Sequence, residues 1–188
     1  VSTNRWSYIP TSNFRRRTDI YTWFDQHWPE DFDLWGNGWN VPNHTVQAFL
    51  GYHRFSTYRG PIPWDLPSKF EVMSRYRFSL CFENYLHEPA YITDHLLDAF
   101  CARCVPVYHG SPLMAQYVPP ETFIDYRYFG SPERLAGFLT NMSESRYQGY
   151  LDAIERFLGS ERAAFFTTDY MWNVIHHRLY GEGGSCSV

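Results

Sequence analysis

Two short apolar segments, separated by a polar loop and a helix-like segment, constrain the fold of this chain most. Residues 77–82 are mainly apolar and run into the polar pair Glu83 and Asn84, and residues 105–108 are again apolar. The segment between them, 91–103, opens with small polar and ionisable residues and continues as a helix. A strand, a helix and a second strand in this order form a βαβ unit, whose strands are parallel. The sequence therefore predicts an α/β domain.

The same alternation extends along most of the chain. We expect a helix over 19–27, a strand over 32–35, a helical turn over 69–74, a helix over 111–117 and a strand over 122–125. A further helix begins at Ser131 and Pro132, a suitable N-cap and first helical residue, and two more occupy 144–158 and 160–179. This order predicts a Rossmann-like, mainly parallel sheet with helices on both faces. Residues 1–180 are expected to form one domain, and 181–188 a disordered tail.

Composition excludes some classes of function. The formal net charge is only -4, and Lys69 is the single lysine among 16 basic residues, so no lysine-rich stripe is available to follow a nucleic acid backbone. Nucleic acid is therefore not an expected partner. No apolar run is long enough for a membrane span. Because the chain starts at Val1 without an initiator Met, we expect the natural polypeptide to begin earlier.

The predicted ligand site lies beyond the first strand of the βαβ unit. In open α/β sheets, ligands bind outside the carboxyl ends of the strands, where the next helix directs its free N–H groups at an anion. A ligand that carries phosphate is therefore expected. An acid in a first helical turn is also stabilised without any ligand, and a threonine there can simply cap the helix. The candidate residues are Glu83, Asn84, Tyr91, Thr93, Asp94 and His95.

The ordered blocks at 76–84, 91–95 and 105–112 resemble the donor-binding signature of the alpha-1,3/1,4-fucosyltransferases, glycosyltransferase family ten. The resemblance extends through 118–125 and 129–135 and back to 11–13. It implies the C-terminal, donor-binding half of a two-domain GT-B enzyme that transfers L-fucose from GDP-fucose to a sugar hydroxyl with inversion. The implied partners are the nucleotide-sugar donor, a glycan acceptor and an N-terminal acceptor domain of the same polypeptide. That other half supplies the general base, so no catalytic residue is assigned here.

The resemblance also assigns roles to single residues. Asn84 would lie beside the nucleotide, and Ser12 and Asn13 match a Ser-Asn turn next to it. Arg17 matches an arginine that holds phosphate, a task for which the guanidinium fork is suited. As a bare run of charge, residues 15–17 would instead form a solvated helix face. Glu83 could equally be a scaffold residue that orients the following loop.

Two positions depart from the family motif Tyr-x-Thr-Glu-Lys, which contacts the donor in the family. Asp94 is one methylene shorter than Glu, and His95 lacks the permanent charge of Lys. A transferase for another nucleotide sugar therefore stays open. A non-catalytic carbohydrate-binding module stays open as well, because 7 Trp and 15 Tyr could provide stacking platforms.

The sequence predicts no obligatory metal or cofactor. Asp31 and Asp33 form an Asp-x-Asp pattern, which is the metal-binding signature of another glycosyltransferase fold but is common by chance. An arginine and a helix N-terminus would take the place of a metal bridge. For the compartment, we expect a soluble domain and favour the cytoplasm over the Golgi lumen.

Overall fold

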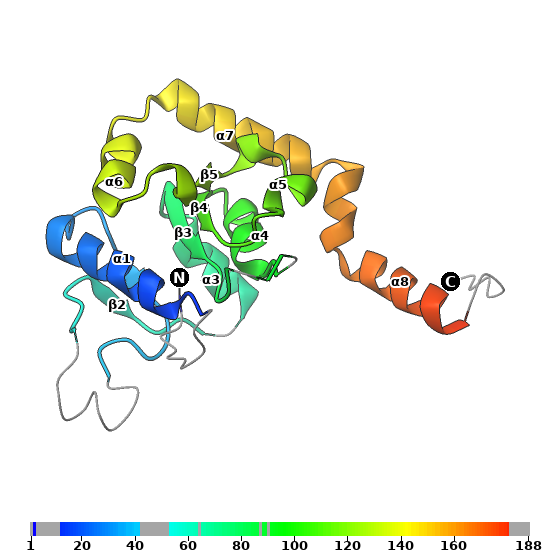
Figure 1. The fold of residues 1–188 in the computed structure, drawn as a ribbon, viewed down its shortest axis with the longest axis horizontal. Coiled ribbons are helices and arrows are strands. Elements are labelled where there is room, and N and C mark those ends of the chain that lie inside the picture. The colour runs from blue at the N-terminus through cyan, green and yellow to red at the C-terminus, as the bar shows by residue number, and fades with distance from the viewer. Residues whose placement is uncertain are drawn as a thin grey trace.

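The computed structural model describes Ser2 and residues 12–41, 53–63, 65–86, 88–89 and 91–180. Helices and strands alternate along this part of the chain (Figure 1). The elements in chain order are α1 (Phe14–His27), β1 (Leu34–Trp35), β2 (Tyr58–Gly60), α3 (Leu66–Met73), β3 (Phe78–Phe82), α4 (Asp94–Cys101), β4 (Val105–His109), α5 (Met114–Tyr117), η1 (Pro120–Thr122), β5 (Ile124–Asp125), η2 (Tyr126–Tyr128), α6 (Pro132–Thr140), α7 (Glu144–Leu158), η3 (Glu161–Phe166) and α8 (Thr168–Tyr180), where η marks a 3-10 helix. The predicted tail, 181–188, lies outside the described residues.

The central sheet contains three parallel strands in the order β3-β4-β5. β3 and β4 pair without a shift, from Phe78 opposite Val105 to Phe82 opposite His109. β1 and β2 form a second parallel pair. Because β3, α4 and β4 follow one another and the two strands are parallel, they form the βαβ unit that the sequence predicts.

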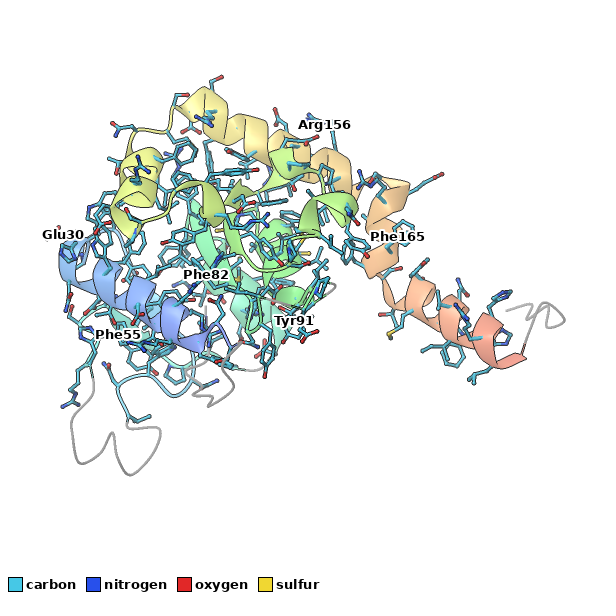
Figure 2. The ribbon with its side chains drawn as sticks, in the orientation of Figure 1. Glu30, Phe55, Phe82, Tyr91, Arg156 and Phe165 are labelled. Carbon is cyan, nitrogen blue, oxygen red and sulfur yellow. The ribbon has the colours of Figure 1, made fainter. Side chains whose placement is uncertain are left out.

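Helices cover both faces of the central sheet. Side chains of successive strand residues point to opposite faces. Cys81 Sγ contacts the backbone O of His95 in α4 at 3.2 Å, whereas the next residue, Phe82, packs edge-on against Tyr21 of α1 with ring centroids 6.5 Å apart. Figure 2 labels Phe82 near the centre of the packed side chains. The prediction of an α/β fold with parallel strands and helices on both faces is confirmed.

Several predicted elements have different ends in the structure. α4 begins at Asp94 and not at 91, because the preceding Thr93 is extended, with φ -110° and ψ -178°. The segment expected as a strand over 122–125 divides into η1 and β5, and the helix expected over 160–179 divides into η3 and α8. β2 was not predicted, because three residues are too few to show an alternating pattern.

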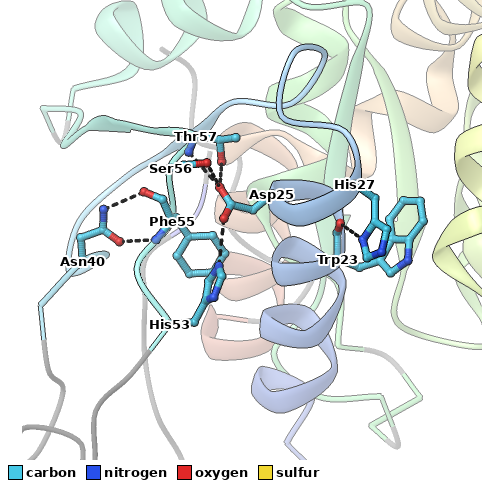
Figure 3. A network of polar contacts seen from close by, with 8 residues as sticks. All are labelled: Trp23, Asp25, His27, Asn40, His53, Phe55, Ser56 and Thr57. Atoms are coloured by element: carbon cyan, nitrogen blue, oxygen red, sulfur yellow. Dashed lines mark hydrogen bonds and ion pairs between the residues drawn. The ribbon is translucent and has the colours of Figure 1, made fainter.

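A buried carboxylate holds the segment before β2 against α1 (Figure 3). Asp25 of α1 is 6% exposed. Its Oδ1 accepts hydrogen bonds from the N–H and Oγ1 of Thr57, both at 2.8 Å, and from Ser56 Oγ at 3.1 Å. Its Oδ2 lies 2.9 Å from His53 Nε2. Burial alone would raise the pKa of Asp25, but the hydrogen bonds outweigh it and lower that pKa below its ordinary value.

The C-terminal helix extends away from the rest of the molecule (Figure 1). α8 carries large exposed apolar side chains, among them Met171, Trp172 and Leu179. Among the described residues, none of the helices combines the length and the apolar character that a membrane crossing needs.

Candidate functional site

The start of α1 is joined to the carboxyl end of β3. Asn13 is 1% exposed, and its Nδ2 donates a hydrogen bond to the backbone O of Glu83 at 2.9 Å. The backbone N–H of Asn13 donates to the backbone O of Asn84 at 2.7 Å. Ser12 pairs with Tyr85 in an isolated antiparallel bridge. These bonds bring the predicted residues Ser12 and Asn13 to the strand end that carries Glu83 and Asn84.

Arg17 and Tyr91 join Asn84 in a chain of side-chain hydrogen bonds, which we call the Arg17 array. Arg17 Nη1 donates to Asn84 Oδ1 at 3.0 Å, and Asn84 Nδ2 donates to Tyr91 Oη at 3.3 Å. The Arg17 guanidinium carbon also lies 4.8 Å from the centre of the Phe14 ring, and the residue is only 4% exposed. The array therefore holds a fixed positive charge at the carboxyl edge of the sheet.

Glu83 fixes the backbone at the head of α4. Its Oε1 accepts a hydrogen bond from the Thr93 N–H at 2.9 Å, and its Oε2 accepts one from Thr93 Oγ1 at 2.7 Å. Glu83 is fully buried, and this burial raises its pKa against the lowering effect of the Thr93 bonds. The geometry thus favours the scaffold role over a direct ligand contact.

Gly110 leaves the space that the buried Glu83 side chain needs. A Cβ atom at Gly110 would stand 2.3 Å from both Glu83 Cγ and Tyr108 Oη. No other residue fits there unless the side chains of both Glu83 and Tyr108 move. This requirement follows from packing across two strands, which no local sequence pattern reveals.

Asp94 faces Lys69, a residue outside the predicted site. Its carboxylate Oδ2 lies 3.1 Å from Lys69 Nζ, and the Asp94 side chain is 65% exposed. Lys69, on α3, also forms an ion pair with Asp98 one turn further along α4. Lys69 and Asp94 are 25 residues apart, so no local pattern could have linked them.

His95 is half-buried at the start of α4. Its pKa is lowered to about 4, chiefly by burial, with Lys69 and Arg17 acting in the same direction and Asp94 in the opposite one. The imidazole is therefore neutral at pH 7 in the ligand-free chain. A diphosphate placed beside it would favour the protonated form.

The neutral His95 makes the stability of the ligand-free chain depend on pH. An unfolded histidine takes up a proton near its ordinary pKa of about 6.5, while folded His95 resists protonation down to about 4. The unfolded state binds more protons in this window, so the free energy of unfolding falls as pH falls. We expect His95 to contribute a loss of about 1–2 kcal/mol between pH 7 and 5, measured by urea unfolding.

Replacement of His95 by Gln should remove this share of the pH dependence. A residual slope is expected, because burial also lowers the pKa of His109 to about 4. His177 is exposed on α8, and His177→Gln should leave the slope of the parent unchanged. An equal slope in the parent and in His95→Gln would contradict the burial of a neutral imidazole.

The second aspartate of the Asp-x-Asp segment has partners within the protein. Asp33 accepts hydrogen bonds from Arg59 Nε and from Tyr76 Oη, the latter at 2.6 Å. Within the described ranges, no group of three or more His, Cys, Asp or Glu side chains is arranged to hold a metal ion. Asp33 instead ties together the segments that carry β1, β2 and the turn before β3.

Comparison with known proteins shows the family to which this chain belongs. A family model described as glycosyltransferase family 10 (fucosyltransferase) C-term matches residues 6–162. The 3-galactosyl-N-acetylglucosaminide 4-alpha-L-fucosyltransferase of Pongo pygmaeus is 32% identical over 148 residues, which are 75% of this chain and 37% of that protein. Alpha-(1,3)-fucosyltransferase 7 of Mus musculus is 41% identical over 103 residues, 51% of this chain and 26% of that protein.

A solved structure, described as an alpha1,3-fucosyltransferase with GDP, shares the fold. It aligns with a TM-score of 0.52 and 22% identity over 77% of this chain and 36% of that one. This chain thus spans well under half the length of the relatives that it matches. With the family model covering most of its length, the chain belongs to glycosyltransferase family 10, the fucosyltransferases, and corresponds to the C-terminal region of that family.

Proposed function

We propose that this chain is the donor-binding half of an inverting fucosyltransferase, which binds GDP-fucose and transfers L-fucose to a sugar hydroxyl. The Arg17 array is the observation that carries the proposal, because it sets a buried cation and two neutral hydrogen-bonding side chains at the carboxyl end of β3. The start of α4, where ligands of α/β folds bind, adjoins it. Family membership supports the proposal, and a relative by fold was solved with GDP.

The reaction needs stabilisation of the leaving group. The acceptor oxygen forms a bond to the anomeric carbon of fucose while the bond from that carbon to the diphosphate oxygen breaks, and GDP leaves with the electron pair. Negative charge therefore grows on the diphosphate. We assign its stabilisation to Arg17, to the N–H groups at the start of α4, and to His95 once the diphosphate has raised its pKa.

The other predicted residues have positioning roles in this proposal. Asn84 and Tyr91 orient the donor, and Asp94 binds sugar hydroxyls beside Lys69. Glu83 and Thr93 fix the loop before α4, and Ser12 and Asn13 fix the start of α1, as their hydrogen bonds indicate.

The acceptor-binding domain and the general base lie outside residues 1–180. We propose that residues 1–180 form one donor-binding domain. An acceptor-binding domain of the same polypeptide would supply the base that deprotonates the attacking hydroxyl. The printed name of the Pongo pygmaeus relative specifies a galactosyl-N-acetylglucosaminide, and we propose an acceptor of this class here. The cytoplasm as compartment stays a prediction from the sequence.

GDP is expected to bind the 188-residue chain without divalent metal. Calorimetric titration in EDTA and in Mg²⁺ should give the same affinity, because Arg17 and a helix N-terminus neutralise the diphosphate. Loss of binding in EDTA would revive a metal role for Asp31 and Asp33.

A panel of GDP-fucose, GDP-mannose and UDP-glucose tests which donor is bound, since Asp94 is held by Lys69 and departs from the family pattern. A carbohydrate-binding module without transferase function should not bind GDP.

A further inference from the structure

A cleft opens at the carboxyl edge of the central sheet, between α1, η2 and the start of α6. Its volume is about 580 Å³, within the range of small-molecule sites, about 300–1,000 Å³. We call it the α1–α6 cleft. None of its residues belongs to the predicted donor site. Those used below are Arg16, Asp19, Trp23, His109, Tyr126 and Arg127.

The cleft lies next to the Arg17 array. Arg16, Asp19 and Trp23 follow one another at helical spacing and share one face of α1, whereas the adjacent Arg17 turns toward Asn84. His109 ends β4, and residues 126 and 127 directly follow β5. Parallel strands end at the same edge of a sheet, so the cleft and the array both lie at this edge, and both include residues of α1. A molecule in the cleft would thus be close to a donor held by the array.

His109 indicates that the cleft receives a hydrogen-bonding ligand. The residue is 8% exposed and borders the cleft, and its Nδ1 has no hydrogen-bond partner among the described residues. Its ring is held between Phe82 and Tyr126, with centroids 5.3 Å from each. Buried polar atoms are almost always hydrogen-bonded, and an unpaired one calls for an explanation. A hydroxyl group in the cleft, directly or through an ordered water, would provide the partner.

The remaining side chains suit an uncharged sugar better than an anion. Arg127 Nε donates hydrogen bonds to the two carboxylate oxygens of Asp125 at 2.9 and 3.0 Å. Arg16 and Asp19, which both line the cleft, carry opposite charges, so the cleft has little net charge. Arginine and aspartate together donate to and accept from hydroxyl groups. Trp23, whose indole is stacked on His27 at 4.7 Å, and Tyr126 add aromatic surface for the C–H groups of a pyranose.

We propose that the α1–α6 cleft binds an uncharged pyranose unit of the acceptor glycan. The role as acceptor site rests on the proposed transferase function, since only then must a second sugar approach the donor. The binding of a sugar by the cleft is supported independently, by the cleft volume, the unpaired His109 Nδ1 and the lining side chains. This assignment gives the C-terminal half a share in acceptor recognition, next to the domain that supplies the base.

Three consecutive arginines provide a matched test. Arg15 and Arg16 are both exposed, and Arg15 does not border the cleft. The probe is the disaccharide β-galactosyl-N-acetylglucosamine, titrated to millimolar concentration into the full chain with and without GDP and followed by ¹H–¹⁵N NMR. We expect Arg16→Ala and Asp19→Ala to weaken disaccharide binding about five- to tenfold and to leave GDP affinity unchanged. Arg15→Ala should change neither, and the Nδ1 signal of His109 should shift during the titration of the parent.

Other outcomes separate the two proposals. The cleft assignment is overturned if the disaccharide fails to bind at millimolar concentration, if GDP displaces it, or if Arg16→Ala and Asp19→Ala bind it as the parent does. If the parent binds the disaccharide with the expected dependence on Arg16 but does not bind GDP, the cleft assignment is supported and the donor-binding proposal fails.

Discussion

Replacement of Asp25 by alanine is expected to lower the free energy of unfolding by about 3–5 kcal/mol, because three donors lose their acceptor and each buried donor left unsatisfied costs about 1–3 kcal/mol. The carboxylate accepts hydrogen bonds from Thr57 and Ser56 and lies next to His53. Alanine would leave these donors facing a buried void with no acceptor. Urea unfolding at pH 7 measures the loss.

Two variants and a pH series control this result. Gln26 is the exposed neighbour of Asp25 on α1, and Gln26→Ala should change stability little. Asp25→Asn keeps one acceptor oxygen but directs an NH₂ group at a donor, so an intermediate loss is expected. Because the pKa of Asp25 is lowered, its charge stabilises the fold above the ordinary Asp pKa of about 3.9, and this contribution is lost as pH falls below it. A loss under about 1 kcal/mol in Asp25→Ala would show that the network does not anchor the segment.

Replacement of Arg17 by alanine is expected to weaken GDP binding about ten- to hundredfold. Loss of a charge-assisted hydrogen bond costs about 1.5–3 kcal/mol, which converts to this range. Asn84→Ala should have a smaller effect of the same sign, because Asn84 is neutral and holds Arg17 in place at 3.0 Å. Calorimetric titration with GDP measures both affinities.

Stability must be measured together with this affinity. Arg17 is 4% exposed and lies over Phe14, so alanine also removes packing, and titrations should be run well below the melting temperature. Arg17→Lys keeps the charge without the fork and should recover only part of the affinity. Arg15→Ala removes an exposed charge next to the array and should bind GDP as the parent does. If Arg17→Ala binds GDP as tightly as the parent does, Arg17 does not hold the phosphate, and residues 15–17 are only a solvated helix face.

The sequence by itself predicts the parts of the fold that depend on short-range patterns. The strands at 78–82 and 105–109 and the helix between them follow from apolar runs and a polar helix start. Ser131 caps α6 as predicted, accepting a hydrogen bond from the Arg134 N–H at 3.4 Å. The predicted residues Arg17 and Tyr91 each lie within hydrogen-bonding distance of Asn84, because the start of α1 and the loop before α4 both meet the carboxyl end of β3.

Only the tertiary structure decided which role each side chain at that edge can have. The buried carboxylate of Glu83 accepts hydrogen bonds from Thr93, and the Asp94 carboxylate forms an ion pair with Lys69. Neither contact could be predicted from the sequence. The Asp25 network and the α1–α6 cleft join segments far apart in the chain. Such contacts depend on which distant segments pack together, whereas hydrophobic periodicity shows only which face of an element is buried. The location of the site therefore follows from local pattern, while its charge, burial and neighbouring cleft follow from long-range packing.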